Sequence, residues 1–261
     1  MAAMYATLKL TFEAKIATLT LSRPEKRNAI CRALIDEFLA ALKEVEDSPA
    51  QVLILEAEGK AFSGGLDLED LKALVTHTAE ENYQHSERIA KLFQSLYDFP
   101  KVTIAAVNGP AIAGGAGLAT LCDFTLASTA ASFGYTEVRI GFVPAIVSAF
   151  LIRQVRDRDA RDLMLSGRII NAEEALRMGL VNEVIAPEEL HSRARKLAEQ
   201  LLENSPASLR ATKALLRDYL RECILRDLRS GLETNAGMRQ SADFKEGVQS
   251  FLERRKPRWS E

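Results

Sequence analysis

The chain has 261 residues, enough for one large α/β domain or for a core with an appendage. Its 34 Lys and Arg residues nearly balance its 36 Asp and Glu residues, so the net charge of −2 gives no reason to expect a nucleic-acid partner. Hydrophobic residues make up 47% of the chain, and no signal peptide or transmembrane run is visible. The three cysteines, Cys31, Cys122 and Cys223, are scattered without a C-x-x-C pair, which predicts a reduced, cytoplasmic protein.

The N-terminal part predicts strands followed by a helix. Residues 6–21 contain two β-prone stretches joined by a short turn, and residues 31–47 carry apolar side chains at helical spacing. The polar loop between them contains three basic residues, Arg23, Lys26 and Arg27. Taken alone, such a cluster is most often a solvated surface loop.

Two later stretches share the order strand, glycine loop, helix. The first is residues 52–68, which include the loop GKAFSGGLDL, and the second is residues 101–123, KVTIAAVNGPAIAGGAGLATLCD. A helix that begins at a glycine loop exposes free backbone N–H groups at the positive end of its dipole. Such an end suits a phosphate or an oxygen that becomes negative during a reaction, and these residues alone favour neither.

A lone carboxylate follows in the glycine-bounded segment 131–144. Glu137 lies there among mostly apolar residues, with Arg139 two positions later. From the residues alone, two roles for Glu137 are equally favoured. It could be a structural partner of Arg139 or of a neighbouring chain, or it could be a functional acid. The histidines His77 and His85 lack metal-ligand spacing, so we expect no metal site.

The C-terminal part reads as helical. Asn171 and Glu174 form a capping-box start, Gly179 can end that helix, and Ser205 before Pro206 can begin another. The apolar faces of this tail must pack on the core or on another subunit. We therefore expect a core over residues 1–200 and a helical lobe for oligomerisation over residues 201–261.

The glycine-rich stretches do not fit other common motifs. The window that begins at Gly115 lacks the last glycine of G-x-G-x-x-G, and no Gly-Lys-Ser/Thr sequence follows the glycines. Ser63 is preceded by Ala61 where a nucleophile elbow needs glycine. After these exclusions, the remaining possibility is a site made of backbone N–H donors and one carboxylate.

Several motifs resemble those of the enoyl-CoA hydratase/isomerase (crotonase) superfamily. They are AFSGGLDL at residues 61–68, the glycine-rich helix start that ends in Cys122-Asp123, and F-G-x-x-E-x-x-x-G around Glu137. The resemblance covers nearly the whole chain. It implies an α/β fold, a spiral of ββα units with a C-terminal helical lobe, and an acyl-CoA thioester substrate. It also implies a homotrimer or a dimer of trimers, with no nucleic-acid or membrane partner and no cofactor beyond the coenzyme A of the substrate.

The resemblance also assigns roles to individual residues. The N–H groups of Gly64 and Gly114 would bind the thioester oxygen as the enolate forms, and Glu137 would be the catalytic carboxylate. Asp67 is better explained as a helix cap, since helix starts favour Asp. The positions that match substrate- or CoA-binding positions of the family are Lys26, Ala29, Ala61, Phe62, Ser63, Asp67, Leu68, Phe251 and Arg254.

Two departures from the family pattern bear on the reaction. Hydratases of the family usually carry a first glutamate where this chain has Gly117, so Glu137 stands alone. After Pro144 the family often has G-A-G-G, whereas residues 145–148 are AIVS, which predicts a narrower or more apolar acyl pocket. We expect an enoyl-CoA hydratase. The alternatives are a Δ3,Δ2-enoyl-CoA isomerase, for which one carboxylate suffices, a thioester-cleaving or decarboxylating enzyme, and a non-catalytic acyl-CoA-binding protein.

Overall fold

A six-stranded sheet forms the centre of the computed structural model, which describes residues 5–260. The strands lie in the order β1-β2-β3-β4-β6-β9; β1 and β2 are antiparallel and the other neighbours are parallel. Their bounds are β1 (Leu8–Glu13), β2 (Ile16–Leu21), β3 (Val52–Ala57), β4 (Val102–Val107), β6 (Phe124–Ser128) and β9 (Glu183–Ile185).

A smaller sheet of three short strands stands beside the first. Strand β5 (Ala111–Ile112) pairs in parallel with β7 (Ser132–Gly134), and β7 pairs antiparallel with β8 (Ile169–Asn171). After strand β4 and again after strand β6 of the large sheet, the next strand along the chain, β5 or β7, belongs to the small sheet. This alternation agrees with the predicted repetition of two strands and a helix.

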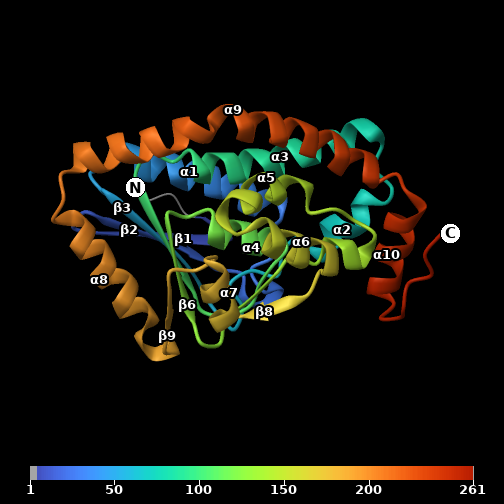
Figure 1. Cartoon of the computed structure of the whole chain (residues 1–261), viewed down its shortest axis with the longest axis horizontal. Coiled ribbons are helices and arrows are strands. Elements are labelled where there is room, and N and C mark those ends of the chain that lie inside the picture. The colour runs from blue at the N-terminus through green and yellow to red at the C-terminus, as the bar shows by residue number, and fades with distance from the viewer. Residues whose placement is uncertain (1–4, 261) are drawn as a thin grey trace.

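Helices surround both sheets, and α9 runs along one whole side of the molecule (Figure 1). The α-helices are α1 (Arg32–Asp47), α2 (Leu68–Leu74), α3 (Ala79–Tyr97), α4 (Gly114–Thr120), α5 (Ala145–Gln154), α6 (Asp157–Ser166), α7 (Ala172–Met178), α8 (Leu190–Leu202), α9 (Pro206–Met238) and α10 (Ala242–Leu252). Three 3₁₀ turns complete the described elements: η1 (Pro24–Lys26), η2 (Glu137–Ile140) and η3 (Pro187–Glu189).

The inner strands of the large sheet are buried on both faces. Along β3, Leu53 and Leu55 point into the main core, whereas Val52 and Ile54 point to the opposite face, which α8 covers. This alternation follows from the two-residue period of a strand. Burial on both faces explains why β3 and β4 read as continuous apolar runs rather than as alternating ones.

The predicted helix caps are confirmed. The side chain of Asn171 accepts a hydrogen bond from the N–H of Glu174 at 2.8 Å, and Gly179 has φ +81° at the end of the same helix. Ser205 caps α9, and the Asp67 side chain accepts from Glu69 N–H at 3.0 Å to cap α2. Some element ends differ from prediction, since β1 begins at Leu8 and α1 at Arg32, and the sequence did not predict the short strands β5, β7 and β8.

The C-terminal helices pack on the rest of the chain. Helix α9 contacts α3 and α5, and its Ile224 and Leu228 belong to the main core. Phe244 and Val248 of α10 pack with residues of α2. The division into a core and an oligomerisation lobe stays a prediction.

Candidate active site

Three segments from distant parts of the chain lie side by side in register. Ser63 forms a parallel bridge with Ala111, and Ala111 pairs in parallel with Phe133. Ile112 N–H donates to the carbonyl of Ser63 at 2.9 Å, which fixes the first of these pairings. Because the three segments run in the same direction, the residues that follow each of them leave at the same edge.

The N–H of Gly64 is not free, so the prediction of a bare donor there is wrong. It donates to the carbonyl of Arg27 at 2.8 Å, which ties the glycine loop to the turn after η1. A hydrogen bond already made to the protein leaves no donor for a ligand at this position. The sequence could not reveal this bond, because its partner lies 37 positions earlier.

The free N–H in this loop belongs to Leu66. Ile30 bridges Leu66 in parallel by donating to the carbonyl of Gly65 at 2.7 Å and accepting from the N–H of Asp67 at 2.9 Å. In such a bridge the residue between the two bonded neighbours presents its own N–H to the opposite side. Within residues 5–260 the Leu66 N–H has no hydrogen-bond partner.

Gly114 supplies a second N–H at the start of α4. It is the first residue of that helix, where an N–H has no partner within the helix. The preceding residue, Ala113, has φ +51° and ψ −120°, a conformation that glycine adopts far more easily than alanine. The two loops touch, because a Cβ built on Gly65 would lie 3.2 Å from the Cβ of Ala113.

Glu137 begins η2, three residues after the end of β7, the strand that pairs with β5. Its Oε2 atom is buried and has no hydrogen-bond partner in the part of the chain that the structure describes. Burial raises the pKa of this carboxyl to about 7, because the charged form is poorly solvated there. A carboxyl with such a pKa can both accept and donate a proton near neutral pH.

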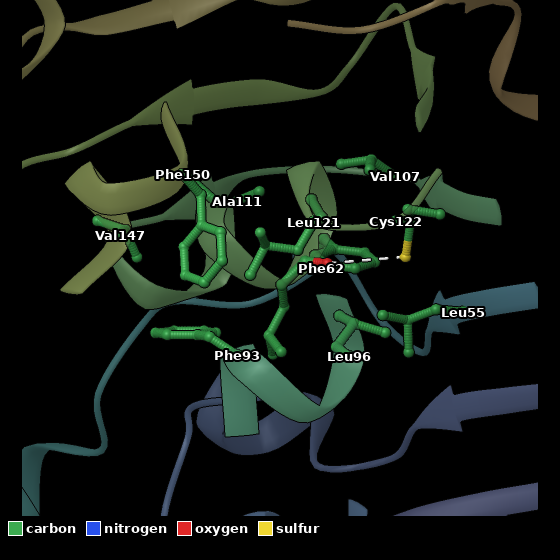
Figure 2. Close-up of a cluster of buried hydrophobic side chains, with 14 of the residues drawn as sticks. Leu55, Phe62, Phe93, Leu96, Val107, Ala111, Leu121, Cys122, Val147 and Phe150 are labelled. Carbon is green, nitrogen blue, oxygen red and sulfur yellow. Dashed lines mark hydrogen bonds between the residues drawn. The ribbon is translucent and has the colours of Figure 1, made fainter. Parts of the chain in front are cut away.

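Apolar side chains fill the space around Gly117. A Cβ built on this glycine would lie 2.8 Å from Cγ1 of Val147 and 3.3 Å from ring atoms of Phe93. Phe93 and Val147 belong to the buried cluster drawn in Figure 2. Val147 thus occupies the place into which a longer side chain at position 117 would grow.

The residues around the first glycine loop divide into buried and exposed ones. Phe62 is fully buried in the core (Figure 2), and the Ser63 hydroxyl donates to the carbonyl of Asn28 at 2.9 Å. Ala29 and Ala61 are also buried. The side chains of Phe62 and Ser63 are therefore unavailable to a ligand. The N–H groups of both already donate to the carbonyl of Pro110, at 3.0 and 3.2 Å, so only other backbone atoms of this loop could take part in binding.

Lys26 and Leu68 are exposed on either side of these buried residues. The basic cluster is only partly solvated, because Arg23 turns inward. Its guanidinium pairs with Asp67 at 3.0 Å and donates to the carbonyl of Ala29 at 2.8 Å. Asp67 is thus both a helix cap and half of an ion pair.

Phe251 and Arg254 lie at the end of α10, and both are exposed. The same helix packs against η2, which Glu137 begins. Among residues 5–260, no three His, Cys, Asp or Glu side chains lie close enough together to hold a metal ion. No helix in that range is both long and apolar enough to span a bilayer.

Solved structures share this architecture. An enoyl-CoA hydratase/isomerase from Xanthobacter autotrophicus Py2 superposes with a TM-score of 0.89 at 28% identity, covering 99% of this chain and 100% of that one. One from Pseudoalteromonas atlantica T6c gives 0.87 at 30% identity, covering 97% and 100%. The predicted crotonase-like α/β fold is confirmed.

Sequence relatives define the family. The family described as enoyl-CoA hydratase/isomerase matches residues 11–261. A Thermus thermophilus protein is 43% identical over 94% of this chain and 97% of its own length. A crotonyl-CoA hydratase of Syntrophomonas wolfei is 34% identical over 97% of both. The chain belongs to the enoyl-CoA hydratase/isomerase family.

Proposed function

We propose that this protein is an enoyl-CoA hydratase that adds water to a 2-enoyl-CoA with Glu137 as its one acid–base group. The observation that carries this proposal is a buried carboxyl with an unpartnered oxygen at the edge where two free N–H groups also lie. The names of relatives support the choice of reaction. They include the crotonyl-CoA hydratase of Syntrophomonas wolfei and a short-chain-enoyl-CoA hydratase of Clostridium acetobutylicum, 33% identical over 94% of both chains.

In the proposed reaction the thioester oxygen accepts hydrogen bonds from Leu66 N–H and Gly114 N–H. Ionised Glu137 takes a proton from water as the hydroxide adds to the β-carbon. The π electrons move toward the thioester, and the negative charge collects on the oxygen between the two donors. Glu137 then returns the proton to the α-carbon, so one water is consumed and no other reactant is needed. Removing one such donor typically lowers the rate about 10²–10³-fold.

The apolar surroundings of Gly117 favour a second candidate reaction. A Δ3,Δ2-enoyl-CoA isomerase needs only one carboxylate, which removes a proton from the α-carbon and returns it to the γ-carbon. Val147 and Phe93 leave no polar group beside Gly117 to hold a water opposite Glu137. The same two donors would stabilise the dienolate, so the machinery proposed for hydration would serve isomerisation unchanged.

A substrate panel separates the two reactions. The protein is incubated with crotonyl-CoA and, separately, with a 3-enoyl-CoA, and the absorbance of the conjugated thioester is followed. Hydration makes the absorbance of crotonyl-CoA fall, whereas isomerisation makes that of the 3-enoyl-CoA rise. A rise without any fall would replace the hydratase by the isomerase. Binding of both thioesters without turnover would leave a non-catalytic acyl-CoA-binding protein.

For coenzyme A we propose contacts from Lys26, the backbone of residues 61–63 and exposed Leu68. Lys26 is an exposed cation in the turn whose following residue, Arg27, bonds the first glycine loop. A phosphate of coenzyme A is a natural partner for such a lysine. Lys26→Ala should raise KM more than it lowers kcat, since it removes binding far from the reacting atoms.

We also propose that copies of this chain assemble into a trimer or a pair of trimers. Helix α9 exposes a stripe of apolar side chains, in which Leu216 is 60% and Tyr219 is 71% exposed. A second copy of the chain would cover this stripe, and Phe251 and Arg254 would then reach the coenzyme A of a neighbour. Light scattering at micromolar concentration tests the assembly, and a monomer would contradict it.

A further inference from the structure

Arg239, which directly follows the last residue of α9, is a buried cation without an anion. Its side chain is only 3% exposed, and no carboxylate within residues 5–260 forms an ion pair with it. Burial lowers its pKa to about 10. Arginine is almost never fully buried unless it is paired, because removing its charge from water is unfavourable.

Neutral groups meet only part of its hydrogen-bonding capacity. One terminal nitrogen donates to the carbonyl of Asn82 at 3.1 Å and lies 3.2 Å from His85 Nδ1, and the other donates to Asn235 Oδ1 at 2.8 Å. The Nε atom is buried and has no partner. His77 Nδ1 is a second buried nitrogen without a partner.

The surroundings of Arg239 contain further potential cations, and two acids, Asp70 and Glu81, interact with one of them, His77. Arg239, His77 and Arg88 all lie near enough to His85 to interact with it electrostatically, and burial together with Arg239 lowers the pKa of His85 to about 3. His85 is therefore neutral and can accept the hydrogen bond from Arg239. A negative charge placed beside Nε of Arg239 would meet a guanidinium that no carboxylate within residues 5–260 pairs with.

A small apolar cluster connects Arg239 with the proposed reaction site. The cluster includes Leu66, whose N–H is one of the two free donors, and Phe142, which follows η2. The guanidinium of Arg239 lies over the ring of Phe142, 5.4 Å from its centre. The Phe142 N–H in turn donates to the carbonyl of Glu137 at 3.0 Å. Leu66, Phe142 and the guanidinium of Arg239 are thus linked through one set of packed side chains.

We propose that Arg239 is a specificity-determining residue that binds a carboxylate at the far end of the acyl chain. This inference rests on the proposed acyl-CoA function and names its substrate class: enoyl-CoA thioesters of dicarboxylic acids. The unpartnered Nε would donate to one carboxylate oxygen, and the carboxylate would supply the negative charge that Arg239 lacks in the protein. A charge-assisted hydrogen bond of this kind favours the charged ligand by about tenfold or more.

Binding of two saturated thioesters tests the inference without requiring turnover. Hexanoyl-CoA and adipyl-CoA have six-carbon chains that end in a methyl group and in a carboxylate, and neither can be hydrated. Calorimetry on the unaltered protein should show adipyl-CoA binding at least tenfold more tightly. Equal affinity, or tighter binding of hexanoyl-CoA, would overturn the role of Arg239. Failure of both ligands to bind would contradict the acyl-CoA function itself.

Variants then assign the effect to the residue. Arg239→Met should abolish the preference for adipyl-CoA and leave the affinity for hexanoyl-CoA within about twofold. Arg229→Met is the matched control, because Arg229 is an exposed arginine on the same helix, and it should change neither affinity. If Arg239→Met does not fold, Arg239→Lys keeps the charge but not the Nε donor and should retain only part of the preference. An unchanged preference in either folded variant would contradict the proposal.

Discussion

The two sides of the proposed reaction site differ in polarity: one contains an ionisable carboxyl, and the other is apolar. On one side Glu137 keeps a carboxyl with a buried, unpartnered oxygen and a pKa of about 7. On the other side Gly117 has no side chain, and Val147 and Phe93 pack where a second carboxyl would stand. On the Glu137 side a polar atom is buried without a partner, which is unfavourable. On the Gly117 side the side chains are closely packed, as in an ordinary hydrophobic core.

This difference indicates which part of the site is functional. Burying an unpartnered carboxyl destabilises the fold, so its presence calls for a use that packing alone does not provide. The apolar side needs no such use, since Val147 and Phe93 gain contacts by filling the space. This contrast supports the proposal that the site has one proton carrier, Glu137.

Replacing the carboxyl should have the largest effect. Glu137→Gln keeps the shape of the side chain but cannot accept a proton, so turnover should fall about 10²–10⁴-fold. Steady-state rates on crotonyl-CoA and on a 3-enoyl-CoA measure the loss, and calorimetry checks that CoA ligands still bind. Turnover at the original rate would make Glu137 a structural residue.

The N–H groups of Leu66 and Gly114 are proposed to bind the thioester oxygen in either reaction. The contribution of the Leu66 N–H can be tested by itself. Incorporating the α-hydroxy acid of leucine at position 66 replaces the N–H by an ester oxygen, which should slow turnover about 10²–10³-fold. The same replacement at Leu68 is the matched control, because an ester bond also weakens the preceding carbonyl as a hydrogen-bond acceptor. At position 66 this affects the bond from Ile30 N–H to the Gly65 carbonyl, and at position 68 the bond from Leu71 N–H to the Asp67 carbonyl. Equal losses at both positions would remove Leu66 from the proposed hole.

Adding a carboxyl to the apolar side would make the two sides alike. Gly117→Glu alone should misfold or lose activity, because its Cβ would meet Val147 at 2.8 Å. Val147→Gly opens that space, so the double variant should hydrate crotonyl-CoA up to about 10²-fold faster than Val147→Gly alone. Isomerisation should not improve. A double variant no faster than Val147→Gly would indicate that water is not held from that side.

The stability of Glu137→Gln should depend on pH. The folded-state pKa of Glu137, about 7, lies above its ordinary value of 4.5, so the folded protein holds this proton more tightly than the unfolded chain. The stabilisation from protonation is complete below pH 4.5 and is lost as pH rises to about 7. At about pH 8 the variant should therefore have a free energy of unfolding about 3 kcal/mol higher than the parent. Denaturant titrations at about pH 4.5 and pH 8 measure this, and a constant difference would mean that Glu137 is not buried as described.

The smallest expected effect comes from the strained start of α4. Ala113→Gly should raise the free energy of unfolding by about 1 kcal/mol, since glycine adopts φ +51° without the alanine's steric conflict. Turnover should stay the same, because the Gly114 N–H is unchanged. Denaturant titration measures the gain, and a loss of stability would show that Ala113 has packing contacts worth more than the strain.

Local signals predicted much of this molecule. The strand–glycine–helix units and the caps at Asn171 and Ser205 follow from side-chain type and short-range spacing, whereas the interest of Gly117 comes from the resemblance to the family. The free N–H of Leu66 does not, because it depends on which neighbours Ile30 and Arg27 bind across more than thirty residues. Arg239 is similar: nothing in its sequence neighbourhood indicates that α3 and α9 enclose it.

The register of the three aligned segments also concerns folding. Ser63, Ala111 and Phe133 meet only through parallel pairings, which require long crossover connections and form late relative to local helices. A slip of one residue in β5 would turn the Gly114 N–H away from the Leu66 loop. During refolding from denaturant, enzymatic turnover should therefore return in a slower phase than the far-ultraviolet helix signal. A chain that is already helical would stay inactive until the strands of its short sheet have paired in the correct register.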